Sequence, residues 1–347
     1  MKRTVKVKDM LIGGENPVSI QSMTNTKTTD AEASLKQIMA LEDAGSQIVR
    51  LSVPDIESAL ALKEIRKHTN IPLVADIHYD YQLAVMSAEN GADKIRINPG
   101  NIGGTANVKY LAEFLRERKI PIRIGVNSGS LEKDIYDRYG NTGRALAESA
   151  LRHVGLLEQC GFYDIIISAK SSSVRQTVEA YRELDRACDY PLHLGVTEAG
   201  IDETGIIKSS IGIGALLLEG IGNTIRVSLT GNPVREVIAA RRILSALNLG
   251  GNMPEIISCP TCARTVIDVE KLAKEIEKRF INARKHIKIA VMGCVVNGPG
   301  EAKECDIGVA GGKERSAIFV KGKIVKTVAN KDLMDELIKR IEELING

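Results

Sequence analysis

The first part of the chain, about 245 residues, alternates between two patterns of apolar positions. Short β-branched runs recur at fairly regular intervals, and segments with the helical spacing of apolar residues, such as 31–44 and 55–68, separate them. We predict eight strands from these runs: residues 18–23, 47–53, 72–77, 94–98, 121–127, 164–170, 191–197 and 223–229. Strands that alternate with helices indicate parallel βα units.

A weak internal repeat supports this pattern. At four positions a glycine follows a predicted helix and a strand begins shortly afterwards: Gly45, Gly91, Gly161 and Gly222. Glycine suits the left-handed conformation just past a helix end. Eight βα units in about 245 residues match the usual size of a (β/α)₈ TIM barrel, which we predict for the N-terminal domain. An open doubly wound sheet is the alternative, but residues 21–26 lack the glycine-rich turn typical of that fold.

A second domain follows the barrel. Residues 248–253 have the composition of a linker, so we predict a barrel domain at 1–247 and a small α/β domain at 254–347. In order along the chain, the second domain is predicted to contain a helix, two strands, a hairpin and a final helix: residues 266–280, 287–292, 306–310, 317–320 with 324–328, and 331–345. We expect Asn330 to cap the last of these helices.

Composition narrows the function classes. The 347 residues carry a net charge of +3 and are 44% apolar, so the chain shows no basic excess for binding nucleic acid or a membrane surface. The most apolar stretch, 211–218, is shorter than the roughly 20 residues that span a bilayer. No apolar segment follows the basic N-terminal residues, so we expect no secretory signal and a cytoplasmic location. There the six cysteines are thiols or metal ligands, not disulfides.

Polar side chains gather at the carboxyl ends of the predicted strands, where active sites of (β/α)₈ barrels form. The set is Gln21, Arg50, Ser52, Asp76, His78, Arg96, Asn98, Arg123, Asn127, Lys170, Thr197, Glu198, Arg226 and Ser228. Because four arginines and a lysine face two acids, either structural carboxylates pair with each arginine or an anionic ligand balances the charge. We predict a phosphate or diphosphate ester, since guanidinium groups bind phosphate oxygens in pairs. The turn at 230–233 opens a helix whose free N–H groups would add phosphate donors.

The sequence leaves two alternative roles for each of His78 and Glu198. His78 follows Asp76 by two positions and is either a metal ligand or, as we expect, a hydrogen-bonded histidine of the site. Glu198 is a candidate general acid at the barrel mouth, and a salt bridge to one of the arginines is the alternative.

Four cysteines of the second domain predict a metal centre. Cys259 and Cys262 form a CxxC motif, and Cys294 and Cys305 follow it. The set suits zinc or an iron–sulfur cluster, whereas a redox pair would need a thioredoxin-like βαβ pattern. A zinc ribbon usually has a second CxxC, which this chain lacks. The Asn-Gly-Pro-Gly loop at 297–300 exposes N–H groups that can bond to cluster sulfurs, so the spacing favours the iron–sulfur cluster.

Long motifs run through both domains. They include CPTCAR from Cys259, MGCVVNGPGE from Met292, SIQSMTNT from Ser19, and also LVADIHYD, KIRINPGNIG, IRIGVNSGSL, LGVTEAG and GIGNTIRVSLTGNP. Together these motifs resemble the 4-hydroxy-3-methylbut-2-enyl diphosphate synthase family over nearly the whole chain. The larger plant-type members carry an extra middle domain, so the resemblance is to the two-domain bacterial form.

The resemblance implies a [4Fe–4S] cluster held by Cys259, Cys262, Cys294 and Glu301, in place of a zinc site with Cys305 as fourth ligand. A carboxylate is a harder and weaker iron ligand than a thiolate, so Glu301 could give way to a substrate oxygen. The resemblance also implies a diphosphate pocket, whose predicted members are Arg50, Asp76, His78, Arg96, Asn98, Arg123, Asn127, Lys170, Arg226 and Ser228.

The implied reaction is reductive. 2-C-methyl-D-erythritol 2,4-cyclodiphosphate takes up two electrons and two protons, its ring C–O bond opens, and water leaves. The product is (E)-4-hydroxy-3-methylbut-2-enyl diphosphate, in the methylerythritol phosphate route to isoprenoids. Glu198 would give a proton to the departing hydroxyl, and reduced flavodoxin or ferredoxin would supply the electrons. The resemblance further implies a homodimer in which the cluster domain of one subunit lies over the barrel of the other, with Gly250 and Gly251 as a hinge.

Two other functions stay open at this point. One is a TIM-barrel phosphate-ester transferase, similar to dihydropteroate synthases, with a structural Cys₄ zinc site. The other is an iron–sulfur carrier or scaffold whose barrel is only a platform. The physiological electron donor and the role of Cys305 are not defined by the sequence.

Overall fold

The computed structural model describes residues 2–98, 100–295 and 304–346. The chain divides into two compact units, Met1–Gly250 and Gly251–Gly347, and this division falls inside the predicted linker at 248–253. Within the described ranges, no helix is both long enough and apolar enough to cross a membrane.

The first unit is a ring of eight parallel strands. Around the ring they are β3 (Ser19–Met23), β4 (Ile48–Ser52), β5 (Leu73–Asp76), β6 (Lys94–Ile97), β7 (Ile122–Asn127), β8 (Ile165–Lys170), β9 (His193–Leu194) and β10 (Thr224–Ile225). β10 returns to pair with β3, and one bridge between Ile167 and Leu192 joins the remaining edges. The predicted TIM barrel is confirmed, and each strand lies within its predicted run.

Two strands are much shorter than predicted. β9 and β10 have two residues each, against predicted runs at 191–197 and 223–229. At the seam between β8 and β9 a side chain replaces part of the ladder. The Tyr181 hydroxyl donates to His193 O and accepts from the Ala169 N–H at 3.2 Å. Backbone groups that bond to a side chain are not free to extend the strand.

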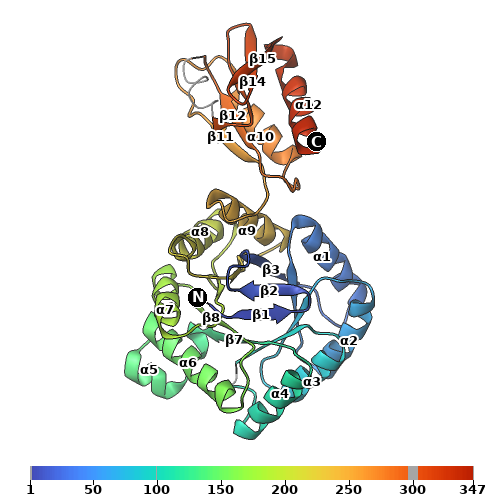
Figure 1. The fold of residues 1–347 in the computed structure, drawn as a ribbon, viewed down its shortest axis with the longest axis vertical. Helices are drawn as coiled ribbons and strands as arrows, with labels where there is room; N and C mark the ends of the chain where they lie inside the picture. Colours follow the sequence, from blue (N-terminus) through green and yellow to red (C-terminus); the bar gives the residue numbers. More distant parts are fainter. Residues whose placement is uncertain (1, 99, 296–303, 347) are drawn as a thin grey trace. The chain divides into compact units, whose positions relative to one another are not determined.

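Helices surround the strands, as Figure 1 shows. They are α1 (Ala31–Ala44), α2 (Ile56–Lys67), α3 (Tyr81–Glu89), α4 (Thr105–Glu117), α5 (Lys133–Tyr139), α6 (Gly143–Gln159), α7 (Val174–Ala187), α8 (Asp202–Leu218) and α9 (Val234–Ala246), with a short η1 (Ser128–Ser130) after β7. Asp30, Asp55 and Asp80 accept from N–H groups of the first turns of α1, α2 and α3. The four glycines of the repeat all have positive φ, as predicted.

A hairpin that we did not predict closes the amino-terminal end of the barrel. It consists of β1 (Thr4–Val7) and β2 (Met10–Gly13), which pair antiparallel. Val5, Val7 and Ile12 pack against side chains that point into the barrel, Ile48, Val74 and Ile166. Because this plug fills the amino-terminal end, a ligand enters the barrel from the carboxyl ends of the strands.

The second unit is a five-stranded sheet. Its order is β11 (Glu255–Ser258), β12 (Lys288–Met292), β13 (Ile307–Ala310), β14 (Arg315–Val320) and β15 (Lys323–Ala329), parallel over the first three strands and antiparallel over the rest. The helices α10 (Val269–Arg279) and α12 (Leu333–Asn346) pack on one face through an apolar core. β11 was not predicted, because this short run directly follows the linker.

Asn330 does not cap the final helix, so this prediction is wrong. It begins a 3₁₀ turn, η3 (Asn330–Asp332), and α12 follows. Its side-chain amide donates to Gly312 O at 2.9 Å and accepts from the Ser316 hydroxyl at 2.7 Å. The side chain therefore ties the end of β15 to the start of β14, and this competing interaction removes it from the helix end.

Candidate functional site

Asp76 joins two of the predicted arginines at the barrel mouth. Arg96 Nη1 donates to Asp76 Oδ1 at 3.0 Å, and Arg50 Nε lies 3.7 Å from Asp76 Oδ2. Arg96 Nη2 also donates to Gly125 O of β7 at 3.1 Å. Burial raises the pKa of Asp76, but Arg50 and the other arginines hold it well below the usual range. Asp76 is thus a single ionised acid shared by at least two cations.

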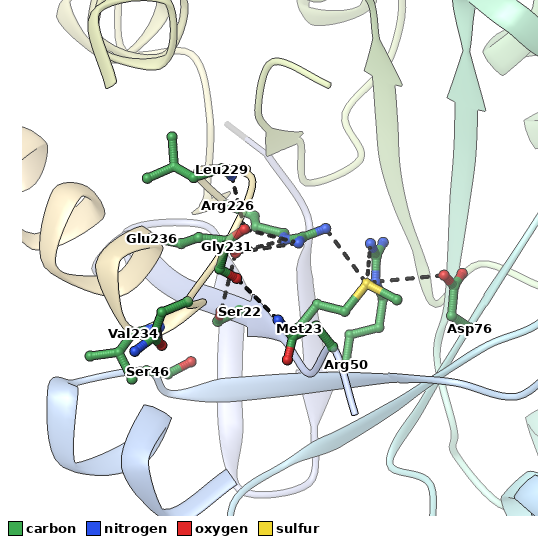
Figure 2. A network of polar contacts seen from close by, with 12 residues as sticks. Ser22, Met23, Ser46, Arg50, Asp76, Arg226, Leu229, Gly231, Val234 and Glu236 are labelled. Atoms are coloured by element: carbon green, nitrogen blue, oxygen red, sulfur yellow. Dashed lines mark hydrogen bonds and ion pairs between the residues drawn. The ribbon is translucent and has the colours of Figure 1, made fainter. Parts of the chain in front are cut away.

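Arg226 has a carboxylate of its own. Glu236, in the first turn of α9 and only 4% exposed, accepts from Arg226 Nε and Nη2 at 3.3 Å each. The same carboxylate accepts from the Leu229 N–H at 2.9 Å and from the Ser22 hydroxyl at 3.3 Å, as Figure 2 shows. Sequence reasoning missed Glu236 because it lies on a helix and not at a strand end. Arg226 therefore has a buried carboxylate partner on its Nε and Nη2.

The N–H groups at the start of α9 are used within the protein. Val234 N–H donates to Asn232 Oδ1 at 3.0 Å, and Arg235 N–H donates to Asn232 O at 3.1 Å. Glu236 N–H donates to Pro233 O at 3.1 Å. The prediction that this turn offers free donors to a phosphate is therefore wrong, because the turn supplies its own acceptors.

Arg123 and Lys170 lie at the buried centre of the mouth. Arg123 is 1% exposed, and its Nε and Nη1 meet no hydrogen-bond partner among the residues that the structure describes. Burial lowers the pKa of both side chains, and the charges of nearby arginines lower it further. Lys170 Nζ packs against Gly195, where a Cβ would come within 2.6 Å of it. Cations packed this closely without matching acids would be stabilised by an anion.

A pocket of about 350 Å³ opens beside Arg96. Five residues with a predicted binding or catalytic role line it from the ends of four strands: His78, Arg96, Asn98, Asn127 and Glu198. His78 Nε2 lies 3.8 Å from Asp76 Oδ2, which is longer than a hydrogen bond. Asn98 Oδ1 accepts from the Gly100 N–H at 3.2 Å and so orders the loop after β6. The structure therefore brings these five residues together at the mouth.

Glu198 faces this pocket from a strained backbone. It is exposed and has a φ of +49°, a left-handed conformation that side-chain-bearing residues rarely adopt. The ion pairs of the mouth arginines go to Asp76 and Glu236 and not to Glu198. The Thr230 N–H donates to Gly200 O at 3.1 Å, which ties the loop of Glu198 to the loop of Ser228.

A layer of buried polar groups lies deeper in the barrel. Lys94 Nζ, both ring nitrogens of His193 and the side-chain amide of Gln21 find no hydrogen-bond partner within residues 2–98, 100–295 and 304–346. Burial lowers the pKa of Lys94 and of His193, and the surrounding cations lower it further. Sequence reasoning missed Lys94 and His193 because they begin their strands. Lys94 lies two residues before Arg96, and His193 two residues before Gly195, so each pair shares one face of its strand.

Three thiols lie at one edge of the second sheet. β11 and β12 are parallel neighbours with Ser258 opposite Val291, so Cys259 and Cys294 follow adjacent strand ends. The Gly293 N–H donates to Cys259 Sγ at 3.2 Å. The backbone around Cys262 is held by Thr265, whose hydroxyl accepts from the Cys262 N–H at 3.0 Å.

Arg264 places positive charge beside two of these thiols. Its backbone N–H and its guanidinium group bond to the Cys262 sulfur and lower the pKa of that thiol. Both Cys262 and Cys294 raise the pKa of Arg264. Thiolates, not thiols, ligate iron, so these contacts favour the form that a cluster needs. The donor set and its surroundings fit three ligands of a [4Fe–4S] cluster.

The two metal hypotheses differ in the fourth ligand, which is Glu301 for the [4Fe–4S] cluster and Cys305 for the zinc site. Glu301, and the loop at 297–300, lie outside the described residues. Cys305, the fourth ligand of the zinc alternative, is 2% exposed and packs with Ala290, Met292 and Phe319. Among the described residues, which include all four of these cysteines, no three His, Cys, Asp or Glu side chains are grouped to hold a single metal ion. This finding applies to Cys259, Cys262 and Cys294 as much as to the four cysteines of the zinc alternative, so it does not separate the two metal hypotheses.

Models of one protein family match both units of the chain. Residues 2–241 match the GcpE TIM-barrel domain, and residues 255–343 match the GcpE protein C-terminal domain. The boundary between the two matches lies next to the boundary between the two structural units.

Curated relatives of similar length share one name, 4-hydroxy-3-methylbut-2-en-1-yl diphosphate synthase (flavodoxin). The protein of Caldanaerobacter subterraneus subsp. tengcongensis is 59% identical over 99% of this chain and 98% of its own length. That of Fusobacterium nucleatum is 56% identical over 98% of this chain and 97% of its own length.

Two solved dihydropteroate synthase structures resemble about 70% of this chain. The dihydropteroate synthase of Yersinia pestis has a TM-score of 0.52 and 12% identity, and the match covers 72% of this chain and 99% of that one. The enzyme of Stenotrophomonas maltophilia gives a TM-score of 0.51 and 12% identity, over 71% of this chain and 98% of that one. At this identity the likeness shows a common fold and says nothing about the reaction.

Proposed function

The chain belongs to the 4-hydroxy-3-methylbut-2-en-1-yl diphosphate synthase family, and from that premise we propose how its residues carry out the reaction. The substrate is 2-C-methyl-D-erythritol 2,4-cyclodiphosphate. Two electrons and two protons enter, the ring C–O bond breaks, and one hydroxyl leaves as water. The product keeps its diphosphate throughout, so a stable diphosphate site is the first requirement of the mechanism.

The observation that carries this proposal is the uncompensated charge of the barrel mouth. Arg123 keeps two buried N–H-bearing nitrogens without a partner in the described chain, and Lys170 lies beside Gly195 within the same group of cations. A diphosphate supplies several anionic oxygens, and guanidinium groups bind such oxygens in pairs. The proposed ligands of that diphosphate are Arg50, Arg96, Asn98, Arg123, Asn127, Lys170, Arg226 and Ser228.

Asp76 and His78 play supporting parts in this site. Asp76 holds Arg96 by a hydrogen bond at 3.0 Å and stays ionised beside the arginines. It therefore fixes the direction of a guanidinium group without removing all of the positive charge. His78 is half exposed in the pocket and can donate to a substrate oxygen.

Glu198 is the proposed proton donor to the departing hydroxyl. It lines the pocket next to the cations, and the ion pairs of Arg50, Arg96 and Arg226 go to other carboxylates. A left-handed backbone at this position costs energy, which the fold tolerates because the loop is tied at Gly200. General acid catalysis needs such a carboxyl within hydrogen-bond reach of the leaving oxygen.

We assign a [4Fe–4S] cluster to the second unit, with Cys259, Cys262, Cys294 and Glu301 as ligands. When bound, such a cluster supplies single electrons and an iron with a replaceable ligand. The Gly293 N–H and Arg264 are the groups of this chain that stabilise negative charge on the sulfurs. Cys305 is left as a buried apolar neighbour of the site.

Reduced flavodoxin is the proposed electron donor, because the curated relatives carry it in their names. Ferredoxin is the second candidate. The proposed location is the cytoplasm, a reducing compartment that keeps cysteines as thiols or metal ligands.

The proposal is tested by turnover together with cluster content. Protein purified without oxygen is expected to hold about four iron and four sulfide per chain. It should convert the cyclodiphosphate when reduced flavodoxin is supplied. Cys294→Ser should lose both the cluster and turnover, whereas Cys160→Ser, a matched change in a barrel cysteine, should keep both. Colourless protein with about one zinc per chain would instead support the transferase alternative.

A homodimer is the proposed working form. Three large apolar side chains are exposed on α8, namely Ile207, Ile211 and Leu218, and such a surface is typical of a protein contact. In the proposed dimer the second unit of each copy supplies its cluster to the barrel of the other copy. Mixing Glu198→Gln chains with Cys294→Ser chains should then restore activity to about a quarter of the wild-type value, because half of the dimers are mixed and each mixed dimer has one intact site. No recovery would show that each chain works alone.

A further inference from the structure

The sulfur of Met23 lies between two arginines of the proposed diphosphate site. Met23 ends β3, and its neighbours in the ring are β4, which carries Arg50, and β10, which Arg226 follows. Arg50 donates to Met23 Sδ from Nε at 3.0 Å and from Nη2 at 2.8 Å. Arg226 Nη1 reaches the same sulfur from the other side at 3.6 Å, and Figure 2 shows the thioether between the two guanidinium groups.

The thioether completes a chain of contacts across the barrel mouth. On one side, Glu236 holds Arg226 through Nε and Nη2. On the other side, Asp76 lies 3.7 Å from Arg50. Each carboxylate therefore sits on the outer side of its arginine, and the position between the two arginines is filled by an uncharged acceptor.

Two cations this close repel each other. Burial lowers the pKa of Arg50 to about 10; Asp76 opposes this effect, while the charges of Arg226 and Arg96 add to it. A carboxylate between the guanidinium groups would relieve the repulsion, but it would also repel a diphosphate. A thioether accepts weak hydrogen bonds and brings no charge.

We propose that Met23 is a positioning residue: its sulfur orients Arg50 and Arg226 toward the diphosphate and leaves their charge available for it. This inference rests on the proposed function of the barrel mouth. It also explains why an apolar residue ends β3 at the inward position where neighbouring strands carry polar groups. An ordinary filling role for Met23 would require only its volume.

Two substitutions separate these roles. Met23→Leu keeps the volume and removes the acceptor, whereas Met23→Gln keeps a neutral acceptor and makes the side chain more polar. A positioning role predicts that Leu weakens binding of inorganic pyrophosphate about tenfold, the loss of roughly one charge-assisted hydrogen bond, and that Gln stays within about threefold of wild type. A filling role predicts the reverse order, because Gln adds polar atoms to a packed position.

The measurements are pyrophosphate affinity by calorimetry and the kinetics of cyclodiphosphate turnover, made on the anaerobic holoenzyme. In Met23→Leu, KM should rise while kcat and the iron content stay near wild type. Met39→Leu, at an exposed methionine of α1, is the matched control and should change neither value. Equal affinities for wild type and Met23→Leu would overturn the assignment. If wild type binds pyrophosphate but does not turn over the cyclodiphosphate, the proposed function fails while the role of Met23 is still decided by the affinities.

Discussion

Gly125 has no side chain at the point where Arg96 needs the room. A Cβ at Gly125 would lie 2.2 Å from Arg96 Nε, and Arg96 Nη2 donates to Gly125 O at 3.1 Å. Glycine inside a strand costs stability, so its presence in the middle of β7 indicates that another group must come close. The absent side chain thus helps to set the direction of a guanidinium group in the proposed diphosphate site.

Gly125→Ala should therefore weaken substrate binding through Arg96. The methyl group would push the guanidinium away from Asp76, and we expect KM for the cyclodiphosphate to rise by about tenfold or more, equivalent to one lost charged hydrogen bond. Gly155→Ala, in α6 with open space around it, is the control and should leave KM unchanged. Unchanged kinetics in Gly125→Ala would show that Arg96 does not contact the substrate.

Arg123→Met should weaken pyrophosphate binding without lowering the free energy of unfolding. Arg123 is buried without matching acids, so its removal relieves repulsion and is expected to keep or raise the free energy of unfolding. Binding of pyrophosphate should fall at least about a hundredfold, because a buried charged contact is lost. The two quantities are measured by denaturant unfolding and calorimetry.

An exposed barrel arginine provides the comparison for that variant. Arg182→Met removes a surface arginine of α7 that pairs with Glu219. It should leave pyrophosphate affinity at the wild-type value, with little effect on stability. A strong loss of stability in Arg123→Met would contradict the idea that this cation is uncompensated without ligand.

The Glu132 carboxylate holds the loop after β7, and this stabilisation should be lost at low pH. Burial raises the pKa of Glu132, but hydrogen bonds from His153 and Ser149 lower it to about 2. A carboxyl group with a lowered pKa stabilises the fold fully above its ordinary value of 4.5, and this stabilisation is lost as the pH falls toward 2. Wild type should therefore be more stable than Glu132→Gln by about 2 kcal/mol at pH 7, and this difference should shrink between pH 4.5 and pH 3.

Urea unfolding of the full chain across that pH range checks the prediction. The matched control is Glu117→Gln, at an exposed glutamate that ends α4. Its effect on the free energy of unfolding should be small at every pH. A Glu132→Gln difference that stays constant from pH 7 to pH 3 would show that the contacts of Glu132 do not depend on its charge.

Cys262 should be a reactive thiol before the cluster is loaded. Contacts from Arg264 lower its pKa, so a larger fraction is thiolate at neutral pH. Iodoacetamide should modify Cys262 faster in cluster-free wild type than in cluster-free Arg264→Gln at pH 7. Mass spectrometry of peptides measures the two rates. Lys339→Gln, an exposed change on α12, should leave the rate unaltered. Equal rates in all three proteins would show that Arg264 does not make the Cys262 thiol more reactive.

Some of this architecture could be predicted from the sequence, and the reasons are physical. Apolar runs and helix-ending glycines repeat locally, so all eight barrel strands could be placed from the pattern. Arg50, Arg96 and Arg123 could be chosen because strand ends converge in a barrel. Partners from distant elements could not be chosen this way: the Glu236 carboxylate on α9 meets Ser22 of β3 only through the closed ring. The turn before α9 shows the same limit, since Asn232 satisfies donors that we expected to be free.

The β1–β2 hairpin at the start of the chain affects how the barrel folds. The β1–β2 hairpin packs on residues up to Ile166, and Lys2 pairs with Asp185. These partners are translated long after the hairpin, so its contacts have a very high sequence separation and form late in folding. Extensions or deletions at the N-terminus should slow maturation of the whole barrel, while the chemistry at the opposite end, once assembled, is spared.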